Sequence, residues 1–244
     1  MIYLIKTHFE IKETIVTILA DSDLFIEIAK KELAAGRFIV ENYIAENPFF
    51  EVTLEAYEPD PSAHPLICRM IDAANTFGIG PMSTVAGVIA EAAVLKMKEA
   101  GATVAVIDNG GDIALYNAGT KPLVIGIYAG KSNVRNLGFS IEPSSEILGI
   151  CTSSGTVGHS ISFGISDAAI IFSKNVALSD AAATALGNAL KEQGKENIEK
   201  ALDVVKVPEI DGAVLIEGND IGIWGKVPKI VKANVNYDLI TKGE

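Results

Sequence analysis

Long apolar runs and cysteine are both scarce in this sequence, and each absence excludes a class of protein. Apolar residues make up 49% of the 244 residues, but they stand in short runs, none near the roughly 20 residues that span a bilayer. The first residues mix acidic with basic side chains and show no small-residue cleavage site, unlike a signal peptide. The two cysteines, Cys68 and Cys151, fit a reducing compartment and lack a metal-binding spacing. We therefore expect a cytoplasmic protein.

Positive charge is scarce as well. The chain has 20 basic and 31 acidic residues, which gives a formal net charge of -11. Such a balance disfavours nucleic acid and anionic membranes as the main partners. It leaves room for a small molecule that carries phosphate, because backbone N–H groups, a helix N-terminus or a bound metal can hold an anion.

The chain does contain many short β-branched runs joined by turn residues, with a few long helical patterns among them. The expected strands are residues 14–19, 49–57, 103–107, 113–116, 123–128, 148–152, 168–172, 213–217 and 221–224. The expected helices begin at residues 21–23, Pro65, Ser83 and Ser179. This pattern predicts an α+β fold with mainly antiparallel sheets packed against a few long helices.

We interpret residues 1–244 as a single domain, because no low-complexity linker interrupts the chain. Each half contains strand runs and an alanine-rich helix opened by a serine, Ser83 in one half and Ser179 in the other. Two pseudo-repeated halves therefore remain an alternative.

A first candidate functional residue is Glu91, in the helix expected from residue 84 to residue 100. This helix is apolar on nearly every side, and a helix of that kind is buried or covered by a ligand. The alternative is that Glu91 lies on the one exposed edge of the helix.

A second candidate is Asn-Gly-Gly-Asp at residues 109–112, between two strand runs. The simplest interpretation is a hairpin turn. Two adjacent glycines also let a ligand approach the backbone closely. We expect this turn at the edge of a pocket, near Thr152 and His159, rather than at a remote hairpin tip.

The third candidate region begins with the hydroxyl-rich residues 152–155 and leads to His159. Small neighbours leave this imidazole exposed, so we expect an ordinary pKa of about 6.5 and a general-base role in the same cleft. A surface histidine without a role is the alternative.

An alanine-rich helix opened by Ser179 completes this region. Its pitch places Asp180 and Thr184, four residues apart, on one face. A carboxylate and a hydroxyl suit Mg²⁺ when phosphates supply further oxygens, and the helix N-terminus favours the phosphate itself. The alternative is an ordinary N-cap with a favourable first-turn charge.

Three pieces of sequence, in this order, resemble the ApbE family of FAD:protein FMN transferases, most of all a short, soluble branch of it. Gly87 and Glu91 are similar to the ends of the helix motif G-Y-A-x-D, with glutamate in place of aspartate. Residues 109–112 are similar to the end of N-x-G-G-D. Residues 152–155 resemble T-S-G, and residues 180–186 resemble D-A-x-x-T-A-L.

The resemblance implies a T-fold-like ApbE-type architecture that binds FAD. It implies that Asp180 and Thr184 hold Mg²⁺ on the pyrophosphate and that His159 assists the attacking hydroxyl. The implied reaction moves FMN onto a Thr or Ser of an acceptor flavoprotein and releases AMP. The residues implied to contact the nucleotide are Gly87, Glu91, Asn109, Gly110, Gly111, Asp112, Thr152, Ser153, Ser154 and Gly155.

Two parts of the family pattern are absent from this chain. The segment H-x-I-x-D-P-x-T-G has no counterpart after His159, and M-G-T near the start is at best Lys-Glu-Thr at residues 12–14. These departures concern the acceptor side and leave the metal pair intact. Three functions therefore stay open: a Mg²⁺-dependent FMN transferase or FAD pyrophosphatase, a flavin- or nucleotide-binding protein without turnover, and a scaffold, with a homo-oligomer as one possibility.

Overall fold

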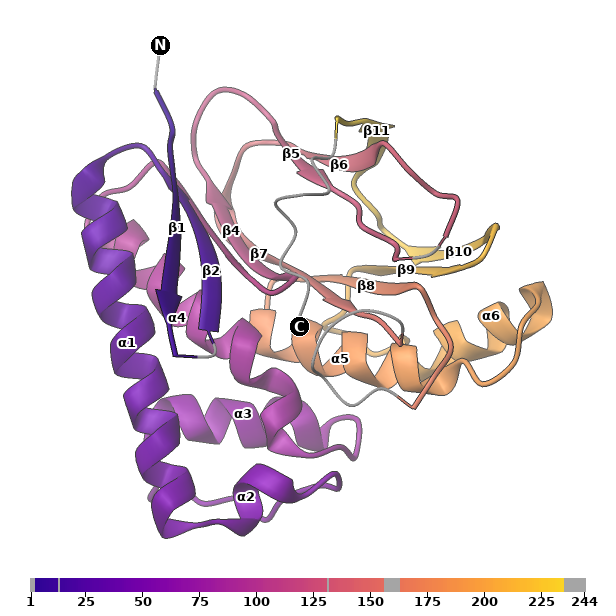
Figure 1. Ribbon diagram of the computed structural model, residues 1–244, viewed down its shortest axis with the longest axis horizontal. Coiled ribbons are helices and arrows are strands. Elements are labelled where there is room, and N and C mark those ends of the chain that lie inside the picture. The colour runs from indigo at the N-terminus through magenta and orange to yellow at the C-terminus, as the bar shows by residue number, and fades with distance from the viewer. Residues whose placement is uncertain (1–2, 13, 131, 156–162, 235–244) are drawn as a thin grey trace.

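Two antiparallel sheets form the framework of the protein (Figure 1). The computed structural model describes residues 3–12, 14–130, 132–155 and 163–234. Within these residues, the larger sheet has, in spatial order, β1 (Ile5–Ile11), β2 (Thr14–Ala20), β3 (Val104–Asn109), β4 (Asp112–Asn117), β7 (Ser144–Ser153), β8 (Ala168–Ser173), β9 (Gly212–Glu217) and β10 (Asp220–Gly225). The smaller sheet has β11 (Lys229–Lys232), β6 (Leu137–Ile141) and β5 (Leu123–Gly126).

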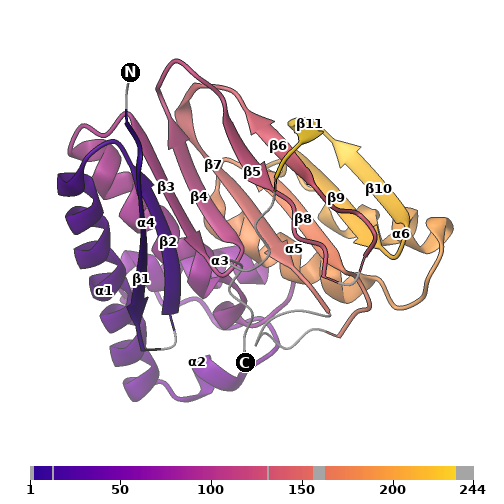
Figure 2. The same cartoon turned by 45° about the horizontal axis from the view of Figure 1, so that its top comes forward.

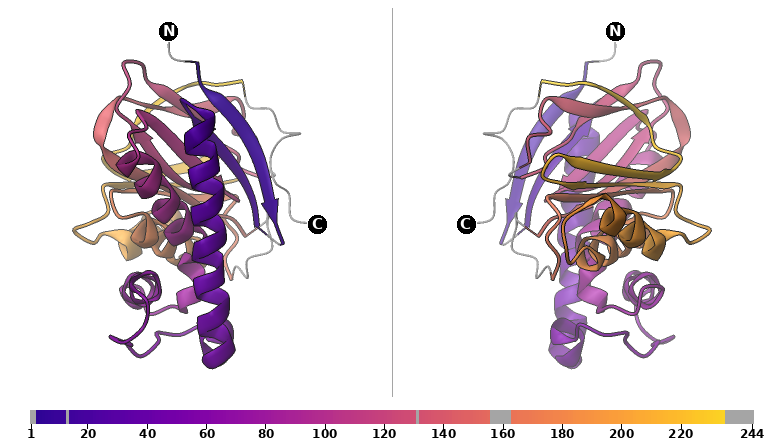
Figure 3. Two further views of the ribbon diagram at one scale, coloured as in Figure 1. Left: turned by 90° about the vertical axis from the view of Figure 1, so that its left-hand side faces the viewer. Right: turned by 90° about the vertical axis from the view of Figure 1, so that its right-hand side faces the viewer.

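The helices lie on one face of the larger sheet, and the smaller sheet lies on the other (Figure 2). They are α1 (Asp23–Glu46), α2 (Phe49–Val52), α3 (Pro65–Asn75), α4 (Val85–Glu99), α5 (Val176–Ala189) and α6 (Lys195–Leu202), with short 3₁₀ turns η1 (Pro81–Thr84) and η2 (Asp203–Val205). Figure 3 shows α1 running past the edge of the sheet, with α2 and α3 beside its lower half. No helix in the described part of the chain is both long and apolar enough to cross a membrane.

The larger sheet separates two hydrophobic cores. Along β3, Ala105 and Ile107 face the helices, whereas Val104 and Val106 face the smaller sheet. Burial on both faces explains why this run is continuously apolar instead of alternating. In the core between the two sheets, the rings of Phe139 and Phe172 lie in a T-shaped contact with their centroids 4.8 Å apart.

The α+β class with mainly antiparallel sheets is confirmed, and two details of the prediction are wrong. The expected strand at residues 49–57 is the short helix α2, followed by an isolated bridge between Glu55 and Ile79. This helix begins after Pro48, whose φ of -60° and ψ of -28° are helical, and it buries Phe50 while Phe49 is 66% exposed. Two helices also start at other residues than expected: α4 begins at Val85 instead of Ser83, and α5 begins at Val176 instead of Ser179. That residues 1–244 form one domain stays a prediction.

The two serines expected to cap helices donate hydrogen bonds to carbonyl groups instead. Ser179 is buried inside α5, which begins at Val176, and its Oγ donates to the Ile171 carbonyl oxygen at 3.0 Å. Asn175 is the N-cap of that helix. Ser83 lies in η1 and donates to the Gly80 carbonyl oxygen at 2.7 Å. A serine in a first turn can therefore mark a tight turn rather than a cap.

The two adjacent phenylalanines of α2 provide a matched test of this packing. Phe50 is enclosed by Tyr43 and Tyr57, with ring centroids 4.9 and 5.2 Å away. We expect Phe50→Ala to lower the free energy of unfolding by about 3–5 kcal/mol, because it leaves a cavity. Phe49→Ala should change it by less than about 1 kcal/mol. Urea denaturation measures both, and equal losses would contradict the assigned burial.

Candidate functional site

The turn between β3 and β4 lies against the first turns of α4 and α5. On the helix-facing side of the sheet, the β3–β4 and β4–β7 registers place Asn109, Asp112 and Cys151 in one cross-strand row. The Asn109 Nδ2 donates to the Ala86 carbonyl oxygen of α4 at 3.2 Å. The Cys151 Sγ lies 3.7 Å from the Val176 carbonyl oxygen of α5. The row therefore connects the sheet to both helices.

Asp180 reaches from α5 to the N-terminus of α4. Gly87 is the third residue of α4, so its N–H has no partner inside the helix. This N–H donates to the Asp180 Oδ2 at 2.8 Å. A Cβ at position 87 would lie 2.9 Å from the Asp180 Cβ and 3.0 Å from its Oδ2. The contact thus requires glycine at this position.

Two acidic side chains face each other at this point. Burial raises the pKa of Asp180, which is only 5% exposed, to about 7, and the Gly87 N–H partly opposes this shift. Burial, and then the charge of Asp180, raise the pKa of Asp112 well above its usual range. Burial followed by these two carboxylates raises the pKa of the Cys151 thiol. Both carboxylates cannot be charged without a compensating positive group.

The described residues contain no group of three or more His, Cys, Asp and Glu side chains arranged to hold a metal. These described residues therefore offer part of a ligand shell at most. Thr184 follows Asp180 by four residues within α5 and is half-buried. Its hydroxyl oxygen belongs to the same helix face as the carboxylate.

The glycine turn is a hairpin, and it lies next to β7 rather than at a remote tip. Gly110 and Gly111 have φ values of 70° and 103°, which glycine adopts without strain. A Cβ at Gly111 would lie 3.8 Å from the Thr152 carbonyl oxygen. The Oγ of Ser153 would lie 3.2 Å from a Cβ at Gly187 of α5. Residues 109–112 and 152–153 thus border one region.

Other expected site residues lie beside this region or outside the described part of the chain. Ser154 is half-buried, and the Gly155 N–H donates to the Ser166 carbonyl oxygen at 2.9 Å. His159 lies outside the described residues. The functional roles expected for these residues stay predictions.

Glu91 is buried, with 6% exposure, so its alternative interpretation as an exposed-edge residue is wrong. Its carboxylate pairs with Arg69 of α3 at 2.5 Å. Burial raises the pKa of Glu91, whereas the charge of Arg69 and the N–H groups of Ala177 and Val176 lower it. Arg69 was not expected from the sequence. It is the one basic residue of α3, and Glu91 is the one buried acidic residue of α4, so their opposite charges were the signal for the pair.

Asn175 and Glu91 lie at the N-terminus of α5, and a phosphate at this helix end stays a prediction. The first two N–H groups face Glu91. The N–H of Leu178 donates to the Asn175 Oδ1 at 3.2 Å, and that of Ser179 donates to the Asn175 carbonyl oxygen at 2.9 Å. Asn175 therefore caps this helix, and Glu91 lies near its first two N–H groups.

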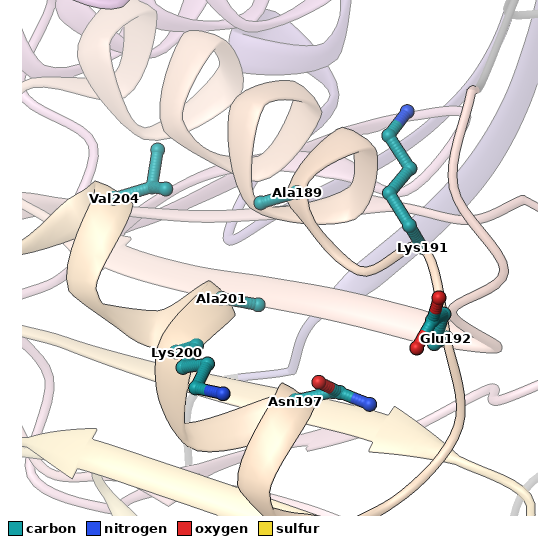
Figure 4. Close-up of a pocket in the computed structure, with 7 residues that line it drawn as sticks. All are labelled: Ala189, Lys191, Glu192, Asn197, Lys200, Ala201 and Val204. Carbon is teal, nitrogen blue, oxygen red and sulfur yellow. The ribbon is translucent and has the colours of Figure 1, made fainter.

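Two shallow hollows in the described residues lie away from these carboxylates. One of about 240 Å³ lies between the end of α5 and α6 (Figure 4). It is lined by Ala189, Lys191, Glu192, Asn197, Lys200, Ala201 and Val204. The other, of about 450 Å³, is lined by residues around Arg135 and Lys232. Neither hollow is lined by two acidic residues. The candidate site is therefore assigned to Asp112 and Asp180, whose oxygen atoms could bind a cation.

The buried Asp180 predicts a pH dependence of stability. Its folded pKa lies above the unfolded value of about 3.9, so its contribution to stability is complete below that value and is lost as the pH rises through about 7. We expect the thermal midpoint of the metal-free protein to fall from pH 5 to pH 8, and to fall less in Asp180→Asn. Thermal unfolding in chelator, with the exposed Asp72→Asn as control, measures this. An equal fall in Asp180→Asn and the parent would contradict the assigned burial.

Comparison with known proteins places the chain in a family. A profile of the family described as AbpE bacteria matches residues 4–211. UPF0280 proteins of Methanococcoides burtonii and Methanosarcina barkeri are each 54% identical to it over 239 residues, which cover 98% of this chain and 100% and 93% of theirs.

Two solved structures share the fold. The Pseudomonas stutzeri flavinyl transferase ApbE, apo form, matches with a TM-score of 0.56 and 14% identity, over 91% of this chain and 94% of that one. The flavin transferase ApbE from Vibrio cholerae matches with a TM-score of 0.53 and 14% identity, over 91% and 96%. The chain therefore belongs to the family described as AbpE bacteria and has the fold of the ApbE flavin transferases.

Proposed function

We propose that the protein is a Mg²⁺-dependent enzyme that acts on FAD, either transferring FMN to a hydroxyl of an acceptor flavoprotein or hydrolysing FAD to FMN and AMP. The observation that carries this proposal is the Asp180 carboxylate, held by the Gly87 N–H, with Asp112 of the glycine turn close enough for the two charges to interact. The likeness of the fold to two flavin transferases supports it. We further propose that the protein acts in the cytoplasm, without nucleic acid or membrane as partner.

The residues at the acidic pair fit a hard cation. The donors are oxygen atoms, which Mg²⁺ prefers, and two like charges in a buried place are relieved by a divalent ion. We assign Asp180 and Thr184 as the residues that would hold it, with Asp112 facing them. Because Mg²⁺ takes about six oxygen ligands, the pyrophosphate and water would supply the others. When bound, the ion neutralises charge on the pyrophosphate and so favours departure of AMP.

The chain's own residues position the substrate in this proposal. The Gly87 N–H fixes the orientation of the Asp180 carboxylate. Gly110 and Gly111 have no side chains, so a nucleotide can approach the backbone of the turn. We propose that residues 109–112 and 152–155 line the nucleotide. The ion pair of Glu91 with Arg69 favours a structural role for Glu91 over the expected contact with the nucleotide.

In the transfer reaction, the acceptor hydroxyl oxygen forms a bond to the FMN phosphorus. The phosphoanhydride bond breaks, and AMP leaves with the bridging oxygen. The hydroxyl proton passes to a base, for which we propose His159. With water as the nucleophile, the same exchange of bonds gives free FMN and AMP.

A flavin-binding protein without turnover is the second candidate function. The substitution of Ser-Ile-Ser-Phe-Gly at residues 160–164 for the family's acceptor-side motif favours it. This change leaves Asp112, Asp180 and Thr184 in place, so binding of FAD with Mg²⁺ is common to both candidates.

Release of AMP separates the two candidates. We expect the parent, incubated with FAD and Mg²⁺, to release AMP, and Asp180→Ala to release it at least about 100-fold more slowly because a metal ligand is missing. Chromatography of AMP and FMN measures the rate, with the exposed Asp72→Ala as the matched control.

Each outcome of this assay has a distinct meaning. AMP without an equal amount of free FMN indicates transfer to protein, and equal amounts indicate hydrolysis. Binding of FAD without AMP, also after a protein extract that supplies acceptor hydroxyls is added, supports the second candidate. A parent that neither binds FAD nor releases AMP would contradict both.

A further inference from the structure

We infer that Glu91 is a positioning residue: paired with Arg69, it fixes the first turn of α5 against α4 and thereby sets the place of Asp180. The catalytic consequence of this inference rests on the proposed function. Its structural part concerns the protein alone and can be tested without a ligand.

The two helices hold each other through a reciprocal pair of carboxylates. Asp180 of α5 accepts the N–H of Gly87 in the first turn of α4 at 2.8 Å. Glu91 lies one turn further along α4 and faces the N–H groups of Val176 and Ala177, the first residues of α5. In each direction, an acidic side chain faces N–H groups at the start of the other helix, where they have no partner in their own helix. A negative charge at a helix N-terminus is also favourable.

The two contacts are mechanically linked. Gly87 and Glu91 are four residues apart in α4, so they lie on one face of this helix, next to α5. A Cβ at Gly87 would lie 3.1 Å from the Val176 carbonyl oxygen, as well as touching Asp180. The start of α5 therefore packs directly on α4 between the two carboxylates. Any shift of that start also moves Asp180, one turn later.

Arg69 supplies the positive charge that keeps Glu91 ionised in a buried place. Its side chain is 39% exposed, whereas that of Glu91 is 8% exposed, so the pair joins a buried carboxylate to a partly hydrated guanidinium. Arg69 comes from α3, so the ion pair brings a third helix to the junction. Loss of either partner leaves buried groups uncompensated.

The junction matters because it positions Asp180, the residue proposed to hold the cation on a pyrophosphate. An error of about 1 Å in the position of a functional group can cost about 100-fold in rate. We therefore expect Glu91 to control the affinity for Mg²⁺ without touching the ion.

Hydrogen exchange of the ligand-free full chain tests the structural part. We expect Glu91→Ala to exchange faster than the parent in segments 85–91 and 176–182, and Glu91→Gln to lie between them, since an amide oxygen still accepts N–H groups. Glu196→Ala is the matched control, because Glu196 forms an exposed pair with Lys200 at 2.7 Å. Exchange in Glu91→Ala equal to that in the control would overturn the inference.

Calorimetric titration of Mg²⁺ in the presence of FAD tests the functional part. We expect the Kd for Mg²⁺ to rise about 10- to 100-fold in Glu91→Ala and to recover largely in Glu91→Gln. Phe139→Leu, which loosens the core between the sheets, should lower the thermal midpoint without changing this Kd. An unchanged Kd in Glu91→Ala, or an equal rise in Phe139→Leu, would overturn the positioning role.

Two further results keep the inference separate from the proposed function. If Glu91→Ala does not fold, Arg69→Met, which removes the partner of Glu91, takes its place in both experiments. If the parent binds no FAD with Mg²⁺, the proposed function fails, and hydrogen exchange alone decides whether Glu91 holds α5 in place.

Discussion

The acidic pair of half-buried Asp112 and buried Asp180 is the constraint on which the rest of the site depends. Burial raises the pKa of both carboxylates, and the charge of Asp180 raises that of Asp112 further, so the pair calls for a positive partner. A structure that served stability alone would not keep such a pair, since burying unpaired charge is costly. The glycine turn, the start of α4 and the body of α5 all converge on it. A cation bound with a phosphate group would resolve this conflict, which is why we connect the pair with function.

The fold creates this constraint by bringing distant segments together at one end of the larger sheet. β3 and β4 carry the glycine turn, and β7 brings Thr152 and Ser153 beside it. The helices α4 and α5 then cover the same end, joined through Gly87 and Asp180. At these N-termini, Asp180 accepts the Gly87 N–H of α4, and Asn175 caps α5.

Local patterns in the sequence predicted the parts of the site that depend on neighbouring residues. The hairpin at residues 109–112 and the helix that contains Asp180 and Thr184 follow from turn chemistry and helix pitch. The pairs that join distant segments left no local signal. Asp112 with Asp180, and Glu91 with Arg69, belong to different elements, and only their packing brings them together. The helix start predicted at Ser179 is wrong for a related reason. The Ser179 hydroxyl donates to the Ile171 carbonyl oxygen of β8 and does not cap the helix.

The most direct test of the account is anomalous diffraction from crystals of the full chain grown with FAD and Mn²⁺ in place of Mg²⁺. The account predicts a single strong anomalous peak at Asp180 and Thr184, facing Asp112, with the FAD pyrophosphate completing its ligands, and no such peak in Asp180→Ala. Flavin bound elsewhere, for example in the hollow between α5 and α6, with Asp112 and Asp180 still facing each other and no metal beside them, would contradict it.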